Sequence, residues 1–235
     1  MIDNSDKKTS KLLIMCILQS LIVLLAGFNI YFNCTASVIC DPIHVRWREM
    51  ISLLFITPVS IILLFVIHKI LEQDRKDAIW PLLLLMLGCC WVAISMGVHE
   101  PINAFRIQFG YNETPLSRIL WFWDDIFSHI IFFAGYVTVS CALLWSQSRN
   151  PLQVSMSFLK SMSFLIFGIL AGVGITYSLV AGASFSIDFF IMLGVLVVAE
   201  IIRAGKSFRT MPLCIVMESS YFLSLILLAL KSFTS

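Results

Sequence analysis

Seven apolar runs of about 20 residues constrain this chain more than any other feature. A helix needs about 20 mostly apolar residues to cross a bilayer, and the stretches between these runs are far shorter than a soluble domain of ~100 residues. We therefore predict an all-α polytopic membrane protein, with residues 1–235 forming a single seven-transmembrane-helix bundle. The predicted spans are Lys11–Phe32, Met50–Ile70, Trp80–His99, Ser117–Trp145, Ser157–Gly182, Ser184–Arg203 and Met211–Leu230.

The composition agrees with a chain that lies almost entirely in the bilayer. Hydrophobic residues make up 59% of it and charged residues 13%, with a mean hydropathy of +0.94, whereas soluble domains carry roughly 25% charged residues. A net charge of +2 is too small to indicate binding to nucleic acid. We expect membrane lipids as the main partners, with a lipid as a possible substrate.

The distribution of basic residues predicts the orientation. Lys and Arg accumulate in cytoplasmic loops, and here they concentrate at the amino terminus and in the second, fourth and sixth loops. This pattern places the amino terminus inside, the carboxyl terminus outside, and the loops 33–49 and 100–118 on the outer side of a plasma or inner membrane. The residues are Lys7, Lys8, Lys11, Lys69, Arg75, Lys76, Arg149, Lys160, Arg203, Lys206 and Arg209.

The outer loops contain two features whose meaning depends on the compartment. Cys34 and Cys40 can form a disulfide if their loop faces an oxidising environment, and the sequence leaves this open. Asn33-Cys-Thr35 and Asn112-Glu-Thr114 are glycosylation sequons on the same side.

Glycines and prolines predict local helix geometry. Gly168-Ile-Leu-Ala-Gly172 is a GxxxG motif, typical of a close helix–helix contact. Pro58 is expected to kink the second span, and Pro101 to end the third span just past His99. Residues 181–188 leave room only for a tight hairpin between the fifth and sixth spans.

The polar residues predicted near the inner face have ordinary interpretations. Glu200 and Arg203, three residues apart, are expected to form an ion pair, and Glu218 to find a partner on a neighbouring helix. His68 is expected at the inner interface, with its polar end reaching water. The spans show no continuous polar track, so an ion pathway has little support.

The fourth span carries the most unusual polar residues. Asp124, Asp125 and His129 lie in its first turns, and Asp125 and His129 share a helical face because they are four residues apart. A charged side chain deep in hydrocarbon costs at least about 2.5–3.5 kcal/mol, so we expect specific interactions to hold these groups. Alternatively, the first turns protrude into water, with solvated aspartates favoured by the helix dipole.

Other candidates gather at the same outer face. The third span ends at His99 and Glu100, the sixth begins near Asp188, and the first outer loop contributes His44. Histidines and a carboxylate on adjacent helices match a catalytic zinc site with an open position for water, whose pKa zinc lowers to about 7. The predicted zinc ligands are His99, Asp125 and His129, with Asp188 or Glu100 completing the set and Asp124 or Ser95 orienting the water.

Ser95-x-x-x-His99, followed by an Asp on the next span, resembles the CREST superfamily of seven-span membrane proteins, which includes alkaline ceramidases and progestin/adiponectin receptors. The resemblance implies a zinc-dependent amide hydrolase acting on a lipid, with Ser95, His99 and Asp124 or Asp125 in the site. The His-x-x-x-His of the family's last helix is absent from Met211–Leu230, so His129 would have to substitute for it.

The leading hypothesis is a metal-dependent membrane hydrolase that acts on a lipid or lipid-like amide or ester near the outer face. One alternative is a haem protein with His99 and His129 as axial ligands. Another is a non-enzymatic seven-span receptor or transporter-like protein.

Overall fold

The computed structural model describes residues 2–32, 35–40, 45–73, 79–109, 114–180 and 185–234. Six helices in this part of the chain are long and apolar enough to cross a membrane, which supports an integral, polytopic membrane protein. Many apolar side chains also face outward, among them Leu159 (77% exposed) and Phe190 (69% exposed). Such a surface suits lipid rather than water.

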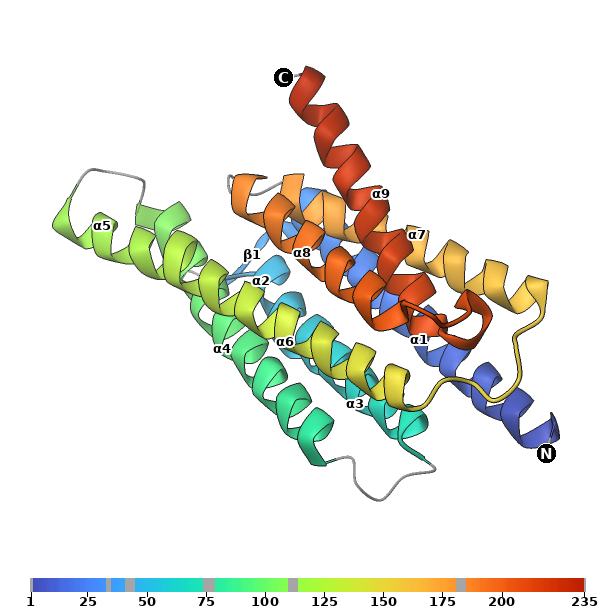
Figure 1. The fold of residues 1–235 in the computed structure, drawn as a ribbon. Helices are drawn as coiled ribbons and strands as arrows, with labels where there is room; N and C mark the ends of the chain where they lie inside the picture. The colour runs from blue at the N-terminus through green and yellow to red at the C-terminus, as the bar shows by residue number, and fades with distance from the viewer. Residues whose placement is uncertain are drawn as a thin grey trace.

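The helical elements are α1 (Ile2–Tyr31), α2 (Trp47–Ile51), η2 (Ser52–Ile56), α3 (Thr57–Leu71), α4 (Ile79–Phe109), α5 (Pro115–Trp121), η3 (Phe122–Phe127), α6 (Ser128–Arg149), α7 (Phe158–Val180), α8 (Phe185–Arg203), the short η4 (Phe208–Thr210) and α9 (Pro212–Thr234) (Figure 1). Elements α2, η2 and α3 form one continuous rod, as do α5, η3 and α6. Each predicted span overlaps a long helix or a continuous helical rod, although α1 begins before the predicted Lys11 and α4 continues past the predicted His99.

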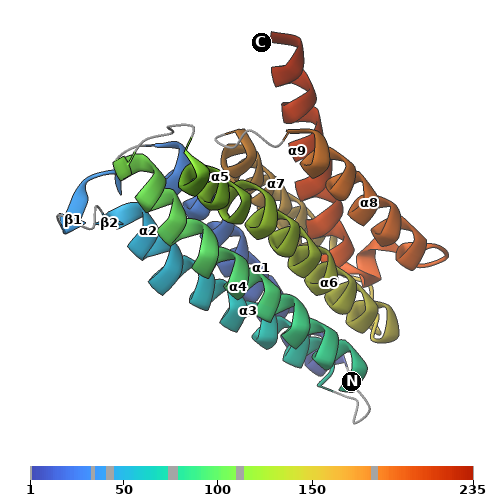
Figure 2. The ribbon, with the colours of Figure 1, turned by 90° about the vertical axis from the view of Figure 1, so that its left-hand side faces the viewer.

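The long helices form a closed ring. Around it, α1 packs on α3, α3 on α4, α4 on α6, α6 on α8, α8 on α9, α9 on α7, and α7 returns to α1. Figure 2 shows α6 between the group of α1, α3 and α4 and the group of α7, α8 and α9. The ring order differs from the chain order because α7 lies between α1 and α9, and the ring encloses an interior space.

Glycines allow the closest helix contacts, and the GxxxG prediction is confirmed. A Cβ added at Gly172 on α7 would lie 2.6 Å from the carbonyl oxygen of Ser220 on α9, and Gly168 abuts the same helix. Gly88 on α4 and Gly135 on α6 face each other, since an added Cβ on either would lie 2.7–2.8 Å from the other's carbonyl oxygen.

One expectation about the third span is wrong. Pro101 does not end the helix: α4 continues through it to Phe109. A proline removes only one backbone donor from the ladder, and the turns beyond it are held by Arg106, which bonds to the neighbouring helix. Pro58 lies at the start of α3, directly after the π-helical segment η2.

Two π-helical segments, η2 and η3, both pack against α4. Such segments are rare and often occur at functional sites. They lie towards the end of the bundle that carries His99, called here the His99 end. The opposite end carries His68 and is called the His68 end.

The chain also forms a small structure that the all-α expectation lacks. Strands β1 (Val38–Cys40) and β2 (Val45–Arg46) pair antiparallel between α1 and α2. Several predictions lie outside the described residues: the Cys34–Cys40 disulfide, the two sequons, His44, and the turn at 181–184.

The polar residues of the His68 end are more deeply buried than predicted. His68 is only 5% exposed, and its Nδ1 lies 3.0 Å from the Ser146 hydroxyl on α6, so the expectation that its polar end reaches water is wrong. The Glu200–Arg203 ion pair is confirmed. Glu218 meets the same guanidinium at 3.3 Å, which confirms a partner on a neighbouring helix.

Candidate functional site

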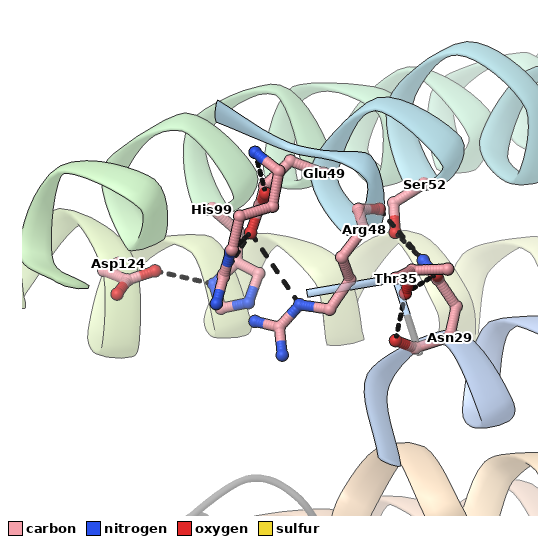
Figure 3. Close-up of polar contacts among 8 residues, drawn as sticks. Asn29, Thr35, Arg48, Glu49, Ser52, His99 and Asp124 are labelled. Atoms are coloured by element: carbon pink, nitrogen blue, oxygen red, sulfur yellow. Dashed lines mark hydrogen bonds and ion pairs between the residues drawn. The ribbon is translucent and has the colours of Figure 1, made fainter. Parts of the chain in front are cut away.

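The His99 site, formed by His99, Arg106, Asp124, Asp125 and His129, joins α4 to η3 and α6. Its shortest link between a histidine and an acid is the 2.7 Å contact from His99 Nδ1 to Asp124 Oδ1 (Figure 3). The Asp124 side chain is 2% exposed and that of His99 is 29% exposed. The two atoms are close but not aligned as a hydrogen bond, and such contacts often tighten only when substrate binds.

Arg106 is a site residue that the sequence analysis missed. Its Nη1 donates to Asp124 Oδ2 and to Asp125 Oδ2, each at 2.6 Å. The guanidinium therefore compensates both aspartates. Its spacing of seven residues from His99, about two helical turns, could have indicated a shared face, but only if the helix continued past Pro101.

The two aspartates lie in different surroundings from those expected, and the roles predicted for them stay predictions. Asp124, expected to orient a water molecule, is buried and contacts His99. Asp125, expected to bind metal, is 38% exposed and paired with Arg106. The six-residue π segment η3 contains both residues, and its wider turn changes which of them faces α4, because helical spacing no longer follows 3.6 residues per turn.

His129 lies beside His99, as predicted. The two ring centroids are 5.4 Å apart, within the range of aromatic contact. The Nδ1 atom of His129 is buried and has no hydrogen-bond partner among the described residues. The structure thus brings together the two histidines from α4 and α6.

The serine hydroxyls of the site are committed to the backbone. Ser95 Oγ donates to the carbonyl oxygen of Ser128 at 2.8 Å, and Ser128 Oγ donates to the carbonyl oxygen of Asp124. Ser95 therefore links α4 to α6, and within the described residues its hydroxyl donates to this backbone carbonyl and not to His99 or Asp124. A serine nucleophile has no support here.

Glu100 faces a different neighbour from His99. It is 3% exposed and lies near Ser52 and Arg48 of the second rod. Asn29 on α1 extends this network by donating to the Arg48 carbonyl at 2.9 Å and to the Ser52 hydroxyl at 3.1 Å (Figure 3). Glu100 therefore helps to fix α4 against α1 and η2.

Arginines and carboxylates at this end nearly balance. Arg46 bonds to Glu49 through its backbone N–H (2.9 Å) and its Nε (2.8 Å), and Arg106 bridges the two aspartates. Counting formal charges, the acids exceed the arginines by one, so a protonated histidine or another cation would restore neutrality. The groups counted are Arg46, Arg48, Arg106, Glu49, Glu100, Asp124 and Asp125.

The described residues do not fit a preformed zinc centre. Among them, no group of three or more His, Cys, Asp or Glu residues is arranged to hold a metal ion. Asp125 is engaged by Arg106. Asp188 lies within α8, but its side chain falls outside the described part. The predicted zinc ligand set stays a prediction.

A cavity of about 560 Å³ opens beside the His99 site. Asp125 and His129 line it together with apolar side chains of α4, α6 and α8. Its apolar lining residues are Trp91, Ile126, Ile130, Phe133, Ala134, Val137 and Ile191, with Thr138 beside them. An apolar pocket with a few polar groups at one place is the usual form of a site for an organic ligand.

Comparison of the chain with known protein families, curated proteins and solved structures found no match.

Proposed function

We propose that this protein is an integral membrane hydrolase that cleaves an ester or amide bond in a lipid or lipid-like molecule. The contact between His99 Nδ1 and Asp124 Oδ1 carries the proposal. A buried carboxylate beside one ring nitrogen orients an imidazole and stabilises its protonated form, which leaves the other nitrogen to act as a general base.

The attacking group in this proposal is water, because the nearby hydroxyls are bonded to backbone carbonyls. His99 removes a proton from the water as its oxygen bonds to the substrate's carbonyl carbon. The bond from that carbon to the leaving oxygen or nitrogen then breaks, and the proton passes from His99 to the leaving group. The products are a carboxylic acid and an alcohol or amine.

Arg106 and His129 have supporting roles. Arg106 holds Asp124 in place and keeps the paired aspartates from repelling each other. His129 faces the cavity beside Asp125, where it would contact the polar part of a substrate. The apolar wall of that cavity suits the hydrocarbon part, which favours an amphiphilic substrate over a small polar one.

We also propose seven spans with the amino terminus inside, which places the His99 site at the outer face. The 19-residue α8 is long enough to serve as the remaining span. The excess of basic residues at the His68 end supports this orientation.

The alternatives fit the geometry less well. Imidazole rings in contact at 5.4 Å leave no room for a haem between them. A zinc-dependent reaction needs a ligand set that the described residues do not form. A receptor-like role predicts no turnover, so the experiment below separates it from hydrolysis.

The test is turnover by the purified full chain in detergent micelles, with a panel of fluorogenic long-chain esters and amides. His99→Asn and Asp124→Asn should each lower kcat by about 10²–10⁴, the usual contribution of a general base. Glu200→Gln, an exposed site at the opposite end, is the matched control. Elemental analysis of the same preparations tests zinc. Absence of turnover on the whole panel, or full activity in His99→Asn, would overturn the proposal.

A further inference from the structure

Five buried side-chain atoms in the described residues have no hydrogen-bond partner, and they lie in three regions along the ring. Buried polar groups are almost always hydrogen-bonded, and exceptions often mark positions where water or an ion binds. Three of the atoms belong to the His99 site, where His99 Nδ1 and Asp124 Oδ1 lie 2.7 Å apart without hydrogen-bond alignment. One of the other two lies in the interior and one at the His68 end. The five atoms are His99 Nδ1, Asp124 Oδ1, His129 Nδ1, Gln19 Oε1 and Glu72 Oε1.

The interior atom faces a chamber inside the helix ring. The chamber has a volume of about 320 Å³, enough for on the order of ten water molecules. Gln19 on α1 lines it and donates to Ser60 of α3 at 2.8 Å, while Gln19 Oε1 remains without a partner. On the other wall, the Ser140 and Tyr221 hydroxyls lie 3.2 Å apart. These groups supply hydrogen-bond partners for water in a space that is lined mostly by apolar side chains.

The chamber reaches towards both ends of the bundle. Met96 of α4 lines it, and His99 lies only three residues further along the same helix. Phe133 and Ile191 line both the chamber and the cavity beside His129, so the two spaces share a wall. Towards the other end, the lining includes Ile67, which directly precedes His68 in α3.

Glu72 is the buried acid of the His68 end. It is 6% exposed and lies at the carboxyl end of α3. Asn150 donates to its Oε2 at 2.8 Å, but Oε1 has no partner. The neighbouring groups are His68 one turn away, Ser146 bonded to His68, and Lys8, which donates to the Leu71 carbonyl at 3.2 Å.

We propose that water in the ring chamber and the Glu72 carboxylate form a proton path between the two ends of the bundle. Protons pass along hydrogen-bonded water held by Gln19 and the chamber hydroxyls, bind to the Glu72 carboxylate, and leave from it to water at the His68 end. The step moves a proton only and needs no oxidant or reductant. It is independent of the proposed hydrolysis.

One apolar layer controls the path. Ile67, Leu143 and Leu213 line the chamber towards the His68 end, and each is 3% exposed or less. This layer is one helical turn from Ser146 and Gln147 on α6. We expect it to limit the rate, so that Leu143→Ser increases proton flux by admitting water.

The experiment uses the full chain in liposomes with a pH-sensitive dye inside, and a potassium gradient with valinomycin to drive protons. Wild-type flux should exceed that of protein-free liposomes. Glu72→Gln and Gln19→Leu should each lower it by about tenfold or more, because positioned groups contribute large factors to proton transfer. Glu200→Gln, an exposed acid at the same end, should leave flux unchanged.

Gel filtration and a thermal melt establish that each variant is folded, and the two variants alter different regions of the path. Wild-type flux equal to that of protein-free liposomes would overturn the proposal. This result is expected if lipid, and not water, fills the chamber. Unchanged flux in folded Glu72→Gln would overturn the proposal equally. Hydrolysis is measured separately in micelles. Failure of one proposal therefore does not decide the other.

Discussion

The two ends of the bundle both bury a histidine and a carboxylate, but they compensate the acid in different ways. At the His99 end, the Arg106 guanidinium bonds to both Asp124 and Asp125. At the His68 end, Asn150 donates a neutral amide hydrogen bond to Glu72 Oε2, while Glu72 Oε1 has no partner in the part of the chain that the structure describes. The guanidinium holds its two carboxylates in one geometry, whereas the Glu72 carboxylate has a neutral partner on one of its oxygens.

The helices that build the two ends also differ. Near His99, the π segments η2 and η3 interrupt regular helix, while α3 and α6 run as ordinary α-helix to the His68 end. The comparison indicates that π-helical segments change the direction of side chains at the His99 end only. The predictions below test this contrast, beginning with the largest effect.

Arg106→Ala should destabilise the protein most. The change leaves two carboxylates without their cation, and breaking a buried ion pair by removing one partner typically costs about 3–5 kcal/mol. Denaturant unfolding in micelles measures it. Arg118→Ala, an exposed arginine on α5, is the control. Equal stability of the two variants would show that Arg106 does not hold the His99 end together.

Gly135→Ala should weaken the packing of α4 against α6. Both helices extend between the His99 end and the His68 end. The added methyl group would lie 2.7 Å from the Gly88 carbonyl oxygen, and such overpacking typically costs about 1–3 kcal/mol. Gly97→Ala on α4 is the matched control, because an added Cβ there meets nothing within 4 Å. The same unfolding assay decides, and a harmless Gly135→Ala would contradict close packing of these helices.

Asn150→Ala should have a moderate effect at the His68 end. It removes the hydrogen bond to Glu72 and leaves a buried carboxylate with fewer partners, at a cost of about 1–3 kcal/mol. Ser148→Ala removes a local bond to the Trp145 carbonyl and serves as the control. A loss as large as that of Arg106→Ala would remove the contrast between the ends.

Glu200→Gln should have the smallest effect. Its pair with Arg203 leaves the Glu200 side chain 52% exposed, and exposed pairs contribute about 0.2–1 kcal/mol. Arg203 keeps its contact with Glu218 at 3.3 Å. A loss above this range, measured at two salt concentrations, would show that this pair belongs to the buried network.

Hydrophobicity and helical spacing were enough to predict much of the fold. The apolar runs located the long helices, and Gly168 and Gly172 indicated the α7–α9 contact that the structure contains. The ring order was not predictable, because apolar runs give the length of a helix and not its neighbours. The β1–β2 hairpin was missed because it lies in a short loop with no strand pattern.

The candidate site was predicted in part. His99 and His129 come together as expected, but Arg106 was missed because Pro101 was expected to end the helix. The contact between Asp124 and His99 was missed for a different reason. A spacing argument assumes 3.6 residues per turn, and η3 departs from it at these two residues.

The chamber inside the helix ring is lined by groups from different helices, so it cannot be predicted from one helix at a time. Gln19, Ser140 and Tyr221 look like isolated polar residues within apolar runs, yet the ring places them around one chamber. The expectation that no polar track crosses the spans considered each helix alone.

The π segment η3 has a consequence for how this site responds to changes in chain length. Removing one residue between Phe122 and Phe127 would let the segment revert to ordinary helix, and each residue turns a helix by about 100°. Asp124 would swing away from His99, while the apolar face of α6 would keep its place in the bundle. A single deletion could thus abolish the polar centre and leave a stable membrane scaffold behind, an outcome that point substitutions rarely produce.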